Sequence, residues 1–150
     1  MPVSRLKFKG IIPPIVTPLL DQETLDEPGL ERLIQRLLEG GVHGIFALGT
    51  TGEAPSLDMI LKRRMIQCVC KNVGSKIPVL VGITDTSFIE SVKLSCYAAD
   101  CGASALVLAP PFYFPSGQTE FLEYVEHLVQ KLPLPLMLYN MPAMTKVHLE

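Results

Sequence analysis

The sequence predicts an α/β fold of parallel strands and covering helices, and three observations lead to this prediction. Short apolar runs recur along the chain, and their starts lie about 26 to 35 residues apart, which is the size of a βα unit. The runs are continuous rather than alternating, as is typical of parallel strands covered by helices on at least one face. Amphipathic segments of helical period separate them. This order indicates either a TIM (β/α)8 barrel or a doubly wound sheet, and both bind ligands at the carboxyl ends of their strands.

Five strands are expected, at residues 10–16, 44–48, 79–83, 105–108 and 136–139. Four helices are expected with them, at about residues 27–41, 56–72, 87–102 and 119–132. The first helix carries one apolar stripe and is closed by two glycines. In the second, Ser56 is a candidate N-cap. Its inward-facing residues are expected to be Ile60, Leu61, Met65, Cys68 and Val69. The third opens with a capping box, Ser87 to Glu90.

Composition narrows the classes of function. The 150 residues are nearly half apolar and carry a formal charge of −2, so we expect one domain without an internal boundary and no nucleic-acid partner. The N-terminal MPVSRLKFKG lacks the features of a signal peptide, and no apolar run is long enough to span a membrane, which favours the cytoplasm. The four cysteines and three histidines lack metal-ligand spacing, so no metal is expected. Buried apolar positions are the better interpretation of the cysteines.

The strand ends carry mainly hydroxyl groups and no histidine. After the second strand comes Gly49-Thr50-Thr51-Gly52-Glu53. Its glycines allow a tight turn, and its two threonines offer hydroxyl and backbone N–H donors near a helix start, so the turn can hold a carboxylate or a phosphate. It is not a P-loop, because no Gly-Lys-Ser/Thr follows. A polar turn without a ligand is the alternative interpretation.

Tyr139 ends the fifth predicted strand. A phenol at this position can serve as a general acid or base when its neighbours tune it. The alternative is a core tyrosine whose hydroxyl is satisfied locally. Because Thr50 and Thr51 stand at the matching end of another strand, the functional interpretation is favoured.

These motifs together resemble a known family. GTTGE at 49–53 and YNMP at 139–142, with PPIVTPL at 13–19 and PPFYFPS at 110–116, resemble the pyruvate-dependent class I aldolases, typified by dihydrodipicolinate synthase and N-acetylneuraminate lyase. The resemblance runs from about Phe8 to Glu150. It implies a TIM (β/α)8 barrel, of which this chain covers about the first five strands and four helices as the N-terminal portion of a single domain.

The resemblance also implies a chemistry without a cofactor. In this family a lysine forms a Schiff base with pyruvate or a related 2-keto acid, and the iminium acts as an electron sink. Carried over by position, Gly49, Thr50 and Thr51 would bind the keto-acid carboxylate, with Thr50 also relaying protons. Tyr139 would be the acid/base group. The family usually assembles as a homotetramer, a dimer of dimers.

At three positions this chain either differs from the family pattern or matches it ambiguously. The family's lysine follows the sixth strand, beyond Glu150, and Lys146 does not occupy its place. Where dihydrodipicolinate synthases carry an arginine for a second carboxylate, this chain has Met144. The tyrosine that they donate across the tight dimer matches Tyr113 or Phe112, depending on the direction of counting.

Several functions therefore stay in competition. The leading hypothesis is a Schiff-base lyase or aldolase that acts on pyruvate plus an aldehyde, or on a 2-keto-3-deoxy sugar acid, as N-acetylneuraminate lyase does. Dihydrodipicolinate synthase is the runner-up, and a dehydratase of keto-deoxy sugar acids shares the machinery. Two alternatives come from other classes. The chain could belong to a non-catalytic relative that binds keto acids but lacks the lysine, or, as the last-ranked alternative, to a doubly wound phosphate-binding domain.

Overall fold

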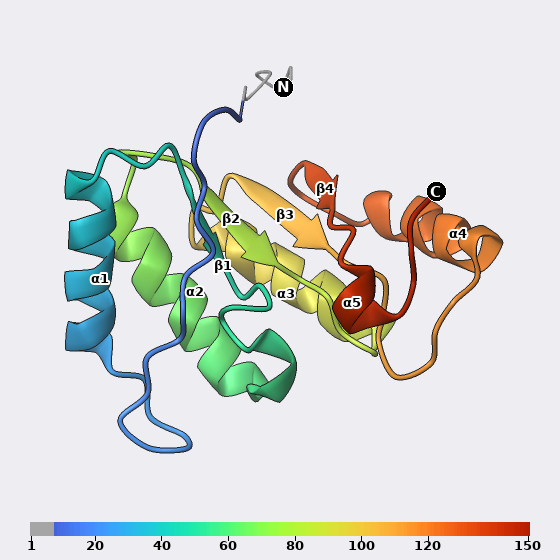
Figure 1. The fold of residues 1–150 in the computed structure, drawn as a ribbon, viewed down its shortest axis with the longest axis horizontal. Helices are drawn as coiled ribbons and strands as arrows, with labels where there is room; N and C mark the ends of the chain where they lie inside the picture. Colours follow the sequence, from blue (N-terminus) through green and yellow to red (C-terminus); the bar gives the residue numbers. More distant parts are fainter. Residues whose placement is uncertain (1–7) are drawn as a thin grey trace.

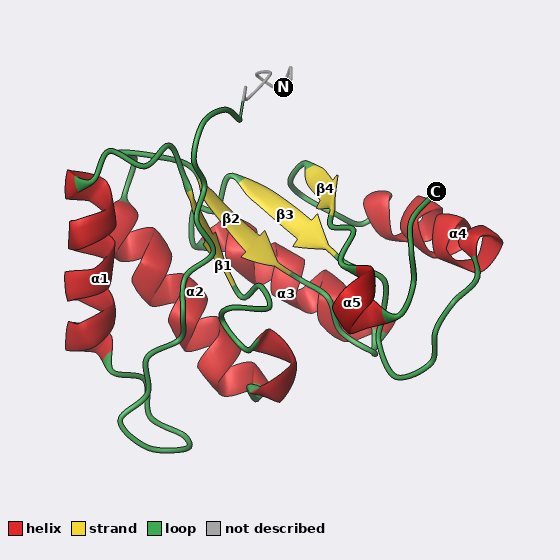
Figure 2. Ribbon diagram, in the orientation of Figure 1, coloured by secondary structure: helices red, strands yellow, loops and turns green. Residues whose placement is uncertain are grey.

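The computed structural model describes residues 8–150 and contains one parallel sheet flanked by helices (Figures 1 and 2). The strands are β1 (Ile45–Ala47), β2 (Val79–Gly82), β3 (Ala105–Leu108) and β4 (Leu136–Leu138). The helices are α1 (Glu27–Glu39), α2 (Met59–Val73), α3 (Phe88–Asp100), α4 (Gln118–Val129) and the short α5 (Pro142–Thr145), with a 3-10 turn η1 (Ala54–Ser56) before α2. The predicted alternation of strands and helices is confirmed. Most of the N-terminal segment in which we expected no signal peptide, residues 1–7, lies outside the described residues.

The strand order is β1-β2-β3-β4, and every neighbouring pair is parallel. A doubly wound sheet reverses its strand order at a switch point, whereas a barrel adds each strand beside the one before it. Within residues 8–150 the order does not reverse. This topology favours the barrel over the doubly wound alternative.

Side chains alternate between the two faces of the sheet and form two apolar clusters. Val79 and Val81 of β2 join the large cluster that the helices cover, whereas Leu80 between them joins a smaller cluster on the other face. That smaller cluster also contains Phe46 and Tyr139. The face opposite the helices corresponds to the interior of the barrel. The part of it that carries Tyr139 lies at the carboxyl ends of the strands.

The predicted strand at residues 10–16 lies beside β1 but forms only an isolated bridge, between Pro14 and Phe46. The Ile15 N–H donates to the Phe46 carbonyl at 3.0 Å, and the Phe46 N–H donates to the Pro13 carbonyl at 3.0 Å. Two consecutive prolines lack the N–H groups that a continuous ladder needs, so the segment stays irregular.

The starts of two helices differ from the prediction. Asp58, not Ser56, is the N-cap of α2, and its carboxylate accepts from the Leu61 N–H at 2.7 Å. Ile60 is 80% exposed, so its predicted inward orientation is wrong; it shares the exposed face of α2 with Arg64 and Gln67, whereas the buried face begins at Leu61. The capping box of α3 is also absent, since the Ser87 side chain makes no capping hydrogen bond and its N–H instead donates to Asp85 Oδ1 at 2.9 Å.

The interpretation of the cysteines holds for only part of the set. Cys68 and Cys70 are buried on α2, Cys101 at the end of α3 is partly buried, and Cys96 is exposed. Burial raises the pKa of the Cys70 thiol to about 12. Cys70 therefore behaves as a small apolar side chain, whereas Cys96 does not.

Within residues 8–150, no helix combines the length and the apolar character that crossing a membrane requires.

Candidate active site

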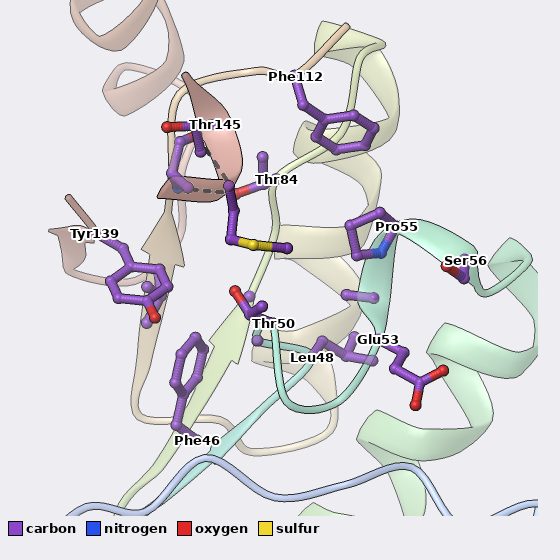
Figure 3. A pocket seen from close by; sticks show the side chains of 16 residues that line it. Phe46, Leu48, Thr50, Glu53, Pro55, Ser56, Thr84, Phe112, Tyr139 and Thr145 are labelled. Carbon is purple, nitrogen blue, oxygen red and sulfur yellow. Dashed lines mark hydrogen bonds between the residues drawn. The ribbon is translucent and has the colours of Figure 1, made fainter. Parts of the chain in front are cut away.

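A cavity of about 390 Å³ opens at the carboxyl ends of the strands (Figure 3). Each of the four strands contributes to its lining at or just after its last residue, through Gly49, Gly82, Ala109 and Tyr139. Helices η1 and α5 close other sides of it. The cavity therefore lies where a barrel is expected to bind its ligand.

The turn after β1 is held in a conformation that few residues adopt. Leu48 is buried at a φ of 59°, in the left-handed region, and it directs the chain into Gly49 and Thr50. Gly82 of β2 accommodates this turn, because a Cβ at its position would lie 2.1 Å from the Leu48 carbonyl oxygen. Backbone strain of this kind is concentrated at functional sites.

The same turn leaves donors free for a ligand. Its internal hydrogen bonds run from the Gly52 N–H to the Gly49 carbonyl at 3.1 Å and from the Glu53 N–H to the Thr50 carbonyl at 3.0 Å. The Thr17 hydroxyl donates to the Gly52 carbonyl at 2.8 Å. The N–H groups of Thr50 and Thr51 donate to no acceptor within residues 8–150. Two adjacent N–H groups and the hydroxyl of Thr50, which lines the cavity, form a donor set suited to a carboxylate.

Tyr139 lies on the same cavity as Thr50. Its N–H donates to the Leu108 carbonyl at 2.8 Å, which anchors the residue at the end of β4. Its ring packs edge-on against Phe46, with the ring centroids 6.0 Å apart. The side chains of Thr50 and Tyr139 both border the cavity in Figure 3. The phenol and the threonine turn therefore meet at one site, although 89 residues separate Thr50 from Tyr139 in the chain.

A second side of the cavity consists of Thr84, Ala109 and Phe112, which we call the Thr84 wall. The Thr84 hydroxyl accepts from the Ala109 N–H at 2.8 Å and lies 3.4 Å from the Ala109 carbonyl oxygen (dashed in Figure 3). The hydroxyl thereby joins the ends of β2 and β3. Phe112 follows three residues later on the loop that leaves β3.

The remaining predicted site residues divide between the cavity and the surface. Met144 lines the cavity and is 61% exposed. Thr51 is exposed and is not part of the lining. Tyr113 is 82% exposed at a φ of 81°, and its ring packs edge-on against Phe114. The two candidates for the dimer-donated position therefore differ, since Phe112 faces the cavity of its own chain and Tyr113 faces outward.

Within residues 8–150, no lysine lines the cavity. Lys146 is exposed in the left-handed region, and its ammonium donates to the Ala143 carbonyl at 2.8 Å. The described part of the chain also holds no group of three or more histidine, cysteine or acidic side chains arranged for a metal ion.

Two lining threonines were not assigned to the site from the sequence. The position of Thr84 at a predicted strand end was a signal that could have assigned it to the site. Thr145 carried none, because it reaches the cavity through α5, which was not predicted. Its buried hydroxyl lies 3.2 Å from the Met141 carbonyl oxygen and 3.1 Å from that of Val147.

Comparison with known proteins gives consistent matches. A model of the dihydrodipicolinate synthetase family matches residues 7–150. A 4-hydroxy-tetrahydrodipicolinate synthase of Methanopyrus kandleri is 37% identical over 96% of this chain and 48% of its own length. YagE of Escherichia coli, named a putative 2-dehydro-3-deoxy-D-gluconate aldolase, is 37% identical over 97% of this chain and 48% of its own. The chain spans about half the length of these relatives.

Solved structures match as well. A dihydrodipicolinate synthase from Bacteroides thetaiotaomicron has a TM-score of 0.90 and 57% identity, over 95% of this chain and 48% of that one. YagE in complex with pyruvate has a TM-score of 0.90 and 35% identity, over 94% and 47%. These matches confirm the predicted fold class, a (β/α)8 barrel of which the chain contributes about half.

Proposed function

The chain belongs to the dihydrodipicolinate synthetase family, and from this premise we propose that it is the N-terminal part of a Schiff-base lyase or aldolase. Its substrates are pyruvate plus an aldehyde, or a 2-keto-3-deoxy sugar acid. The observation that carries the proposal is that Thr50, with free donors on its turn, and the Tyr139 phenol line one cavity at the carboxyl ends of the strands.

In this proposal the turn after β1 binds the carboxylate of the keto acid. The N–H groups of Thr50 and Thr51, with the Thr50 hydroxyl, are hydrogen-bond donors that a carboxylate can accept from at small cost in reorganisation. Gly49 allows the turn to pack against the Phe46 ring, because a Cβ there would lie 2.7 Å from that ring. Support for a keto acid comes from the relative YagE, whose structure was solved with pyruvate.

Tyr139 is the acid/base group of the proposal, and Thr50 relays its proton. Forming the Schiff base expels the keto oxygen as water, and this oxygen needs a proton. The later aldol step moves a proton to or from the aldehyde oxygen. A phenol beside a hydroxyl on one cavity can serve both steps.

The lysine of the Schiff base belongs to residues that follow Glu150. Support comes from the described lysines, which do not line the cavity, and from relatives about twice as long as this chain. The nitrogen of that lysine forms a C=N bond with the keto carbon. The electrons of the broken or forming C–C bond are then delocalised toward the iminium nitrogen.

Met144 favours an aldehyde that lacks a second carboxylate. It stands on the cavity where an arginine would grip such a group, and a thioether offers no charge to do so. Dihydrodipicolinate synthase is the second candidate, because the 57% identical structure bears that name.

We further propose a cytoplasmic homo-oligomer, assembled as a dimer of dimers. Tyr113 and Phe114 are exposed aromatic side chains on one loop, a composition typical of interface residues. Of the two candidates for the residue donated to a second copy, Tyr113 is the better one, since Phe112 belongs to the lining of its own cavity.

Reduction with borohydride in the presence of pyruvate tests the function. The intact protein should gain one covalent adduct, and peptide mapping should place it on a single lysine that follows Glu150. Pyruvate without borohydride is the control. No adduct would favour the non-catalytic keto-acid-binding alternative, and an adduct on Lys146 would refute the assignment of the lysine.

Comparing two aldehydes separates the two candidate activities. With pyruvate as partner, an uncharged sugar aldehyde should be a better substrate than an aldehyde of similar size that carries a carboxylate. Met144→Arg should move the preference toward the charged aldehyde, whereas Met144→Gln should not. A wild-type preference for the charged aldehyde would support the synthase.

A further inference from the structure

We infer that the ion pair between Lys62 and Asp85 is a positioning device for the Thr84 wall and thereby governs recognition of the second reactant, the aldehyde. This inference rests on the proposed function. The pair joins Lys62 Nζ to Asp85 Oδ2 at 3.3 Å, and the two side chains are 7% and 19% exposed. Neither residue lines the cavity.

The burial of this pair calls for a reason other than stability. Removing two charges from water is costly, and an apolar pair of similar volume is often as stable or more so. The other two ion pairs of residues 8–150 differ in this respect. Arg64–Glu27 and Lys93–Glu90 have cationic side chains that are about half exposed.

Lys62 connects the pair to one side of the cavity. It lies in the first turns of α2, where its N–H donates to the carbonyl of Asp58, the N-cap. One residue, Leu57, separates that cap from η1, whose Ala54, Pro55 and Ser56 all line the cavity. A displacement of the start of α2 is therefore transmitted to this side.

Asp85 connects the pair to the Thr84 wall. It is the residue after Thr84, and both of its carboxylate oxygens are engaged, Oδ2 with Lys62 and Oδ1 with the Ser87 N–H at the start of α3. The Thr84 hydroxyl in turn accepts from the Ala109 N–H. One continuous set of contacts thus runs from α2 to the loop that carries Phe112.

The ion pair therefore couples the start of α2, which follows η1, to the Thr84 wall, and in this inference it fixes the separation between η1 and that wall. The keto-acid donors are held mainly by contacts that do not involve the ion pair, since the turn after β1 is closed by its own backbone and by Thr17. The start of η1 adds the Ala54 N–H, which donates to the Gly49 carbonyl at 3.5 Å. In the proposed function the keto acid occupies the side of Thr50 and Tyr139. The Thr84 wall then faces the second reactant.

Steady-state kinetics of the intact protein test this inference. Lys62→Met keeps the length of the side chain and removes its charge. It should raise KM for the aldehyde about tenfold, within the roughly 10²-fold loss that a misplacement of 1 Å can cause. KM for pyruvate and the yield of the borohydride adduct should stay within about twofold of the wild type. Asp85→Asn, which keeps the acceptor for Ser87, should act in the same direction and more weakly.

Lys93→Met is the matched control, because it removes an exposed lysine from an ion pair on α3. It should change neither KM. A folded Lys62→Met with an unchanged aldehyde KM would overturn the inference. Equal rises in both KM values would do the same, because they indicate a general loss of structure. Should Lys62→Met not fold, Asp85→Asn decides by the same criteria.

Hydrogen exchange separates this inference from the proposed function. The Ala109 N–H bonds to Thr84, so its exchange should accelerate at least about tenfold in Lys62→Met and not in Lys93→Met. If the wild type forms no adduct with pyruvate, the proposed function fails and this exchange rate still tests the positioning role. Unchanged exchange at Ala109 would refute it.

Discussion

Replacing Gly82 by alanine tests how the cavity is built. An alanine Cβ at this last residue of β2 would lie 2.1 Å from the carbonyl oxygen of Leu48 and 2.9 Å from its carbonyl carbon. Both are backbone atoms, so no change of rotamer relieves the contact. The Leu48 carbonyl would have to retreat by roughly 0.9 Å to reach the 3.0 Å below which such contacts essentially do not occur.

Two consequences follow from that displacement. Overpacking of a close contact costs about 1–3 kcal/mol, so the free energy of unfolding should fall by this amount. Because Leu48 leads directly into Gly49 and Thr50, the carboxylate donors should move with it. A misplacement of about 1 Å can cost roughly 10²-fold in rate, and we expect kcat/KM for the keto acid to fall about 10- to 10²-fold.

Urea unfolding and steady-state kinetics of the intact protein measure both effects. Gly40→Ala is the control, because Gly40 has a φ of −71° and the nearest atoms to its Cβ position lie at 3.4 Å. It should change the unfolding free energy by no more than about 0.5 kcal/mol. A Gly82→Ala protein as stable and active as the wild type would refute the argument. Lost stability with unchanged kcat/KM would separate the turn from substrate binding.

Four further predictions concern the site and the surface. Tyr139→Phe should lower turnover about 10²- to 10⁴-fold without changing the melting temperature, and unchanged turnover would remove Tyr139 from the mechanism. Thr50→Val should raise KM for pyruvate by at least about tenfold in initial-rate assays, since it removes a donor to a charged group. With iodoacetamide at pH 8, mass spectrometry should show Cys96 labelled and Cys70 protected, because a pKa of about 12 leaves only about 10⁻⁴ of that thiol ionised; equal labelling would contradict this. The isolated 150-residue chain should be inactive and should aggregate, because the edge strand β4 exposes Leu138, and monomers with lyase activity would disprove this.

The sequence by itself determined the order of the elements and where the chemistry lies along the chain. Periodicity and strand-ending motifs are local properties, and they suffice to place Thr50 and Tyr139 at strand ends. The parallel arrangement followed, because βα units of this length bring all strand ends to one side. These inferences depend only on residues that are close in sequence.

Local patterns were less successful at helix starts and for single side chains. Ser56 and Asp58 are both good N-caps, and the choice between them depends on η1, which Pro55 and the turn before it produce. Ile60 was grouped with the apolar stripe of α2, yet it lies on the exposed face of that helix with Arg64 and Gln67, whereas its neighbour Leu61 in the same turn is buried.

Only the tertiary structure decided which distant residues meet. The pairing of Lys62 with Asp85 spans 23 residues, and the bond between Thr84 and Ala109 spans 25. Each joins two elements through side chains whose partners are set by the register of β1, β2 and β3. Hydrophobic period and turn composition are properties of one segment, so they can be predicted from the sequence. Register and packing are properties of the whole sheet, so only the tertiary structure determines them.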